Sequence, residues 1–111
     1  MQIRKTYQEL NPDLLFDELR DFIQQQGATL DESKMQSYST PLGTEHVSRG
    51  TLTFKMGGKE CLRAHIIGSA AGETKMILDI NEKAFPAEKV SALEDDLSFI
   101  FGSYEVKGPK K

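Results

Sequence analysis

The sequence contains a single cysteine, two histidines and no tryptophan, and these scarcities exclude whole classes of protein. Because Cys61 has no second thiol to pair with, a small domain built on intramolecular disulfide bridges is excluded. No cysteine or acidic partner stands at a zinc-ligand spacing from His46 or His65. We therefore predict neither a metal site nor a cofactor.

Long hydrophobic runs are also missing. Apolar stretches such as residues 64–67 are far shorter than the roughly 20 residues that span a bilayer. Arg4 and Lys5 stand near the start, but the apolar core of a signal peptide does not follow them. The chain is thus expected to have no membrane segment and to be cytoplasmic.

Neither sign of charge dominates the composition. The formal net charge is −3, hydrophobic residues make up 38% and charged residues 28%, as in an ordinary globular domain. A general nucleic-acid surface usually needs a basic balance, so nucleic-acid binding is not expected. The 111 residues suit one core. Residues 1–106 are predicted to form a single domain, and residues 107–111, with a glycine, a proline and three lysines, a disordered basic tail.

Two helices are predicted where apolar residues recur at helical spacing. Asn11, Pro12 and Asp13 form a typical helix start, and Gly27 is a typical stop. The apolar face of this first helix consists of Leu15, Leu19, Phe22 and Ile23, with Phe16 beside them. Pro86 opens the second helix. Its apolar stripe comprises Val90, Leu93, Leu97, Ile100, Phe101 and Tyr104.

Five strands are predicted around these helices. Residues 46–56, 60–68 and 74–81 alternate apolar and polar side chains, as strands with one buried face do. Residues 3–9 alternate loosely, and residues 28–40 keep no common parity, which indicates an irregular or edge strand. The result is an α+β domain with the order strand, helix, four strands, helix. An antiparallel sheet of four to five strands packs both helices on one face.

A hairpin is predicted at Gly57 and Gly58. If Leu62 is to share a face with Phe54, the loop needs an odd number of residues, so a three-residue loop that includes Lys59, with a bulge, is predicted. The pairs that follow are Phe54 with Leu62, Leu52 with Ala64, and Gly50 with Ile66.

The opposite face of the sheet has no helix to cover it and is relatively basic. Its candidate binding residues are Arg49, Lys55, Arg63, His65 and Lys75, with Thr51, Thr53 and Cys61 beside them. Two interpretations stay open, namely a solvated face that only satisfies strand propensity and a site for an anionic ligand or partner. No aromatic residue occupies an outward position in the three clear strands, which disfavours the stacking of single-stranded nucleic acid.

The end of the last helix has more apolar width than one sheet face can cover. The candidate contact residues are Phe99, Phe101 and Tyr104, with Ile100 among them. Three interpretations stay open. The first helix fills the space, or a protein partner or second subunit of a homodimer packs there, or helix and sheet enclose a cavity for a small apolar ligand.

No catalytic group is predicted. Cys61 and His65 share one face of a strand, but their Cβ atoms would lie about 13 Å apart at 3.3 Å per residue, too far for a direct hydrogen bond. The glycine-containing segments 57–59 and 68–72 are interpreted as hairpin turns, because a phosphate loop needs a helix after it.

The order of elements resembles a reduced helix-grip arrangement, in which a curved sheet wraps a C-terminal helix. The resemblance is one of order and includes no residue motif. We expect a non-enzymatic binding or protein-interaction domain that uses the open face or the groove beside the last helix. The alternatives are a helix-grip-like domain with an apolar small molecule in a cavity, enzymatic activity included, and an anion or nucleic-acid binder that uses the basic face. The cavity would be lined by Leu52, Phe54, Met76, Leu97 and Phe101.

Overall fold

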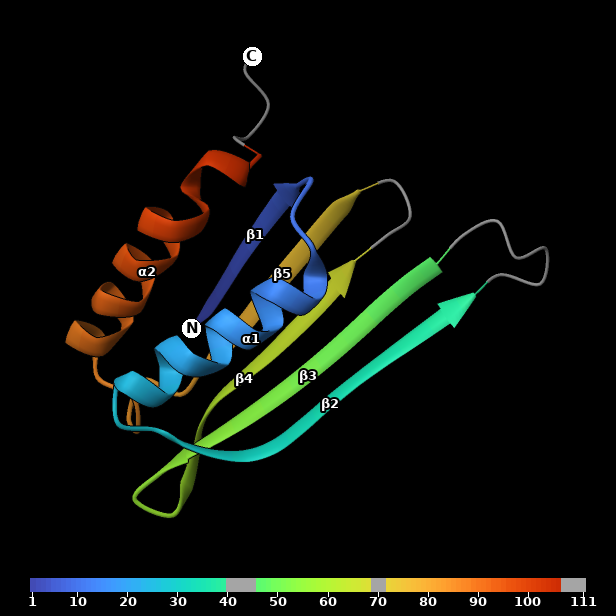
Figure 1. Ribbon diagram of the computed structural model, residues 1–111. Coiled ribbons are helices and arrows are strands. Elements are labelled where there is room, and N and C mark those ends of the chain that lie inside the picture. The colour runs from blue at the N-terminus through green and yellow to red at the C-terminus, as the bar shows by residue number, and fades with distance from the viewer. Residues whose placement is uncertain (40–45, 69–71, 107–111) are drawn as a thin grey trace.

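The computed structural model describes residues 1–39, 46–68 and 72–106, and its element order confirms the predicted α+β fold (Figure 1). The elements are β1 (Gln2–Gln8), α1 (Pro12–Gln25), β2 (Thr29–Ser39), β3 (His46–Met56), β4 (Lys59–Gly68), β5 (Glu73–Ile80), α2 (Ala87–Phe101) and the short 3-10 helix η1 (Gly102–Tyr104). The tail predicted for residues 107–111 lies outside the described residues. Among the helices that are described, none is long and apolar enough to cross a membrane.

All five strands belong to one antiparallel sheet with the order β1-β5-β4-β3-β2. The first strand of the chain therefore pairs with the last, and β1 and β2 form the two edges. The register of β2 against β3 shifts between Leu30 and Glu32. This bulge places the even-numbered Leu30 and the odd-numbered Met35 on the same side of the sheet, which is why residues 28–40 keep no common parity in the sequence.

The β3–β4 hairpin has the register that the sequence predicts. All the predicted pairs are present: Phe54 with Leu62, Leu52 with Ala64, and Gly50 with Ile66. These residues face the helices and are buried, so the inner side of the sheet presents a continuous apolar surface to the core.

The hairpin reaches this register by a different route from the one predicted. The three-residue loop is wrong, because Met56 pairs with Lys59 and only Gly57 and Gly58 form the turn. Both glycines have positive φ angles, 64° and 82°, as a tight two-residue hairpin turn requires. The extra residue lies inside β4 instead. It is Cys61, which the bulge turns from its predicted outward position into the core.

Both helices lie on the same side of the sheet, α1 across its middle and α2 alongside β1 (Figure 1). α1 begins as predicted, because the Asn11 side-chain oxygen accepts a hydrogen bond from the Asp13 amide at 2.7 Å. It ends just before Gly27, which has a left-handed φ of 96°. Its buried side chains are Leu15, Phe16, Leu19, Phe22 and Ile23.

One aromatic side chain of α2 contacts both the sheet and α1. The ring of Phe101 meets the ring of Tyr7 from β1 edge-on, at 6.1 Å between centroids, and that of Phe22 from α1 at 6.5 Å. Burial raises the pKa of the Tyr7 hydroxyl, and the negative charge of Glu105 raises it further. The remaining buried residues of α2 are Val90, Leu93 and Leu97.

Candidate binding surface on the outer face of the sheet

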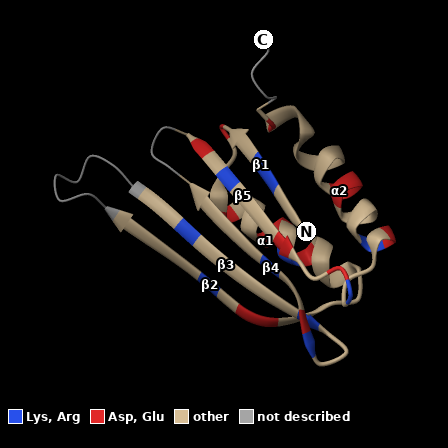
Figure 2. Cartoon of the chain, turned by 180° about the vertical axis from the view of Figure 1, so that it is seen from behind, with Lys and Arg blue, Asp and Glu red and all other residues tan. Residues whose placement is uncertain are grey.

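The side of the sheet that faces away from the helices, named the outer face, is open (Figure 2). The structure places all five sequence-predicted binding residues on this face. Arg49 and Lys55 come from β3, Arg63 and His65 from β4, and Lys75 from β5. The strand register therefore brings together side chains that the sequence could only assign to a common parity.

Three of these five side chains already face a carboxylate. The pairs, with their N–O distances, are Lys55 with Asp31 (3.5 Å), Arg63 with Glu60 (3.1 Å) and Lys75 with Glu73 (4.0 Å). Exposed ion pairs of this kind are weak, so each basic side chain can leave its carboxylate and bind another anion. For Arg49 and His65, the described part of the chain supplies no ion-pair partner.

Apolar side chains cross the outer face between these cations. Val47 on β3, Ile67 on β4 and Ile77 on β5 occupy successive diagonal positions, and each is half-buried. Diagonal neighbours on adjacent strands lie within contact range of long side chains. These three residues are named the diagonal stripe.

Each isoleucine of the diagonal stripe stands between two basic positions. Ile67 pairs with Arg49 on β3 and with Lys75 on β5. The second isoleucine, on β5, pairs with His65 on β4 and with Arg4 on β1. The centre of the outer face is thus an apolar strip bordered by the cations Arg49, Lys75 and Arg4 and by the imidazole of His65.

Two cations of the outer face were missed by the sequence-based prediction. Arg4 lies beside β5 only because β1 pairs there, and strand order is not readable from the sequence. Its Nε donates a hydrogen bond to the Gln2 side chain at 2.7 Å. Lys34 pairs with Thr51, and the bulge at Asp31 hides its outward parity. For Arg4, the alternation in residues 3–9 indicated which side of the strand it occupies. The sequence contained no such signal for Lys34.

One aromatic ring does reach the outer face. Tyr38 on β2 pairs with Val47, its side chain is about half exposed, and its hydroxyl donates to the Gln36 side chain. It stands near the end of an edge strand, so it offers a single ring and not a row of rings. Stacking of successive bases needs several rings, so nucleic-acid stacking on this face remains disfavoured.

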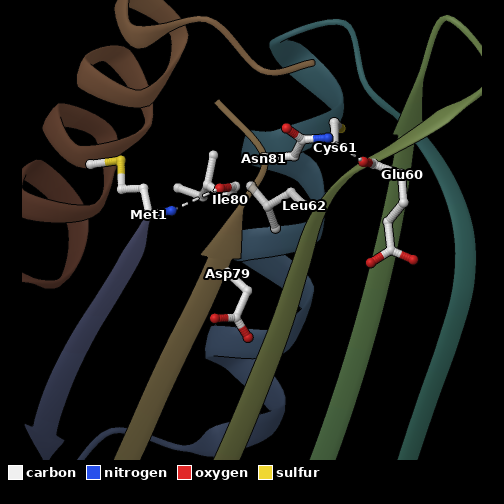
Figure 3. Close-up of a pocket in the computed structure, with 7 residues that line it drawn as sticks. All are labelled: Met1, Glu60, Cys61, Leu62, Asp79, Ile80 and Asn81. Carbon is white, nitrogen blue, oxygen red and sulfur yellow. Dashed lines mark hydrogen bonds between the residues drawn. The ribbon is translucent and has the colours of Figure 1, made fainter. Parts of the chain in front are cut away.

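A hollow of about 250 Å³ lies where β4, β5 and the N-terminus meet (Figure 3). Its lining residues are Met1, Glu60, Cys61, Leu62, Asp79, Ile80 and Asn81. The amide of Asn81 donates to the Glu60 carbonyl at 3.4 Å, and the N-terminal ammonium donates to the Ile80 carbonyl at 3.1 Å. Within the described ranges, no three His, Cys, Asp or Glu side chains cluster closely enough to hold a metal ion.

Cys61 contributes to the lining of the hollow, but its side chain is turned into the core and shielded from solvent. Cys61 is fully buried, and burial raises the pKa of its thiol; a backbone hydrogen bond offsets part of this increase, and the charge of Glu60 raises the pKa further. We expect a disulfide reagent to modify the native protein at least about a hundredfold more slowly than the urea-unfolded chain at neutral pH. Absorbance of the released thiol reports both rates. Equal rates would contradict the burial of Cys61.

The residues expected to line an apolar cavity form packed core instead. Leu52, Phe54, Met76, Leu97 and Phe101 are each at most 2% exposed. A second hollow of about 410 Å³ lies at the start of α1, lined mainly by residues 9–13. Neither of the two described hollows is lined by these core residues.

The candidate contact residues at the end of α2 separate into two environments. Phe101 is in the core, whereas Phe99 is 87% exposed and Tyr104 41% exposed. Ile100 is also partly exposed beside Phe99. The apolar width seen in the sequence is therefore real, and only part of it is covered by this chain.

Among the residues that the structure describes, the outer face and the end of α2 both combine charged side chains with apolar groups that are not fully buried. Neither a protein-family model, nor a curated protein, nor a solved structure matches this chain. What the two surfaces bind must therefore be inferred from their own charges and apolar groups.

Proposed function

We propose that this chain is a non-enzymatic binding domain that holds an acidic, amphipathic segment of a partner protein on the outer face of its sheet. The observation that carries the proposal is the pairing of Ile67 with both Arg49 and Lys75, repeated around Ile77 by His65 and by a cation of β1. An apolar strip with basic borders complements a helix or strand whose own apolar strip has acidic borders.

The two components of this surface have different roles. Full burial of an isoleucine side chain contributes about 1.5–3 kcal/mol, and because Ile67 and Ile77 are already half-buried, each offers about 1 kcal/mol. The cations at the border mainly raise the association rate and set the orientation of the partner. Binding through this face alone should be weak and strongly dependent on salt.

A protein segment suits the outer face better than a nucleic acid does. The stripe is aliphatic, and bases stack on aromatic rings, of which the face has Tyr38 at one edge. Glu32 and Asp79 are also exposed on this face, paired across from Thr53 and Arg63, so its basic side chains form a short patch and not a continuous track for a phosphate backbone.

The test uses a synthetic amphipathic peptide of about 18 leucine and glutamate residues, about 27 Å long as a helix. Fluorescence anisotropy of a dye on the peptide reports binding. Affinity should fall as salt shortens the Debye length from about 10 Å at 0.1 M to about 3 Å at 1 M. Arg49→Glu should weaken binding at least about tenfold, equivalent to about 1.4 kcal/mol.

Lys83→Glu is the matched control. It changes the net charge by the same amount at an exposed residue of the turn that follows β5, so the peptide affinity should stay within about twofold of the wild type. Equal losses in the two variants would mean that net charge alone attracts the peptide, and the proposal would be wrong. Tighter binding of a mixed-sequence single-stranded RNA, weakened by Arg49→Glu, would identify a nucleic acid as the partner class and also overturn it.

A further inference from the structure

The helix side of the molecule carries charge of the opposite sign to the centre of the outer face. α1 and α2 each contain four acidic residues and one basic residue. Figure 2 shows acidic residues along α2, while basic residues occupy the middle of the sheet. The helix side and the centre of the outer face therefore have complementary charge.

The end of α2 combines this acidity with an exposed apolar group. Phe99 has the largest exposed fraction among the exposed large apolar side chains, 87%, and Ile100 is next to it at 43%. Asp95 and Asp96 precede Phe99 by four and three residues, which places them one helical turn away on the same side. Across residues 1–39, 46–68 and 72–106, no basic group lies within ion-pair distance of either aspartate. These four residues are named the Phe99 surface.

We infer that the Phe99 surface docks on the outer face of a second copy of this chain. In this contact Phe99 covers the diagonal stripe, and Asp95 and Asp96 approach the cations beside Ile67, which are Arg49 and Lys75. The inference rests on the proposed function and names a partner for that surface. Both components match, because an aromatic ring meets aliphatic side chains and carboxylates meet basic groups.

The negative charge of the Phe99 surface favours this contact over two alternatives, a symmetric dimer and a lipid bilayer. A symmetric dimer with two Phe99 surfaces in contact would bring four aspartates together, and like charges at contact distance are unfavourable. An anionic lipid bilayer would meet the same repulsion. The outer face is the apolar surface of opposite sign that this chain itself provides.

The placement of the two surfaces determines the form of the assembly. The Phe99 surface belongs to the helix layer and the diagonal stripe to the opposite side of the sheet (Figures 1 and 2). The contact is therefore head-to-tail, and a pair of copies keeps one free Phe99 surface and one free outer face. Head-to-tail contacts that do not close into a ring grow into open chains. Because each contact is small, the protein should be monomeric when dilute and should assemble as its concentration rises.

Two variants that each lose one surface test the inference by sedimentation velocity. Phe99→Gln removes the ring and keeps the outer face, whereas Arg49→Glu damages the outer face and keeps the Phe99 surface. Each variant alone should stay monomeric at concentrations where the wild type assembles. Mixed in equal amounts, they retain one productive contact, so the mixture should form dimers that do not grow further.

Matched measurements keep the outcome unambiguous. Leu14→Gln makes the same kind of change at a half-exposed residue of α1 and should leave assembly unaltered. Circular dichroism verifies that every variant is folded. A mixture that stays monomeric, or wild-type assembly that persists in Phe99→Gln, would overturn the inference.

The same variants separate this inference from the proposed function. Phe99→Gln keeps a complete outer face, so its affinity for the acidic peptide should equal that of the wild type. If the wild type stays monomeric at every concentration while Arg49→Glu still weakens peptide binding, self-association alone is wrong. If Arg49→Glu affects neither measurement, both proposals are wrong.

Discussion

Replacing Phe101 with alanine should lower the free energy of unfolding by about 3–5 kcal/mol, whereas replacing Phe99 with alanine should change it by less than about 0.5 kcal/mol. Phe101 is 1% exposed and its ring contacts those of Tyr7 and Phe22, so its truncation leaves a cavity where α1, α2 and β1 meet. Phe99 is 87% exposed and loses little on truncation. Urea unfolding followed by circular dichroism measures both values.

The comparison controls for helix propensity, because both substitutions replace phenylalanine with alanine in the last turn of α2. A large loss for Phe99→Ala would mean that Phe99 is covered by more of the chain than the structure shows. A small loss for Phe101→Ala would mean that the three aromatic rings do not form part of the core.

The sequence placed Phe99 and Phe101 in one candidate group, and the structure shows why that grouping was too coarse. Residues two apart on a helix point about 200° from one another, so Phe99 and Phe101 cannot share a side of α2. Apolar composition alone does not tell which side faces the core. The contacts of Phe101 with Tyr7 and Phe22 decide it, and they join residues that are far apart in the sequence.

The alternation of inward and outward residues was enough to predict the register of the β3–β4 hairpin but not the length of its turn. The requirement that Phe54 and Leu62 share a face fixes their pairing, whatever lies between them. The sequence placed the odd residue in the loop, but Gly57 and Gly58 form a favourable two-residue turn, so the odd residue moves to Cys61 in the strand. A bulge costs little when the displaced side chain is small and apolar enough to enter the core.

The candidate surface was predicted as far as alternation alone could reach. Arg49, Arg63 and Lys75 lie on strands with clear alternation, so their common face was readable. Which cations lie beside the diagonal stripe also depends on the order of the strands in the sheet. That order brings Arg4 beside Ile77. Sequence spacing does not show that β1 lies beside β5, and the β4–β5 register that aligns Ile67 with Lys75 was not predicted, so the diagonal stripe was not foreseen.

Gly50→Ala should lower the free energy of unfolding by about 1–3 kcal/mol, although alanine is intrinsically better than glycine inside a strand. A Cβ atom on Gly50 would lie 2.6 Å from Cδ1 and 2.8 Å from Cε1 of Phe16, closer than carbon atoms approach. The ring of Phe16 is buried where α1 crosses β3, so relief requires the helix to move away from the sheet. The same urea unfolding experiment measures the loss.

Gly102→Ala provides the control, because a Cβ atom there has nothing within 4 Å and the backbone is already right-handed helical, so its stability should be unchanged or slightly higher. Phe16→Ala alone should cost about 3–5 kcal/mol by opening a cavity. In the double variant the new methyl group enters the space that the ring has left. The combined loss should therefore be smaller than the sum of the two by about 1 kcal/mol or more. Additive losses would show that a side chain at position 50 and the ring of Phe16 do not compete for the same space. The absence of a side chain at Gly50 would then not be the reason that α1 packs so closely on β3.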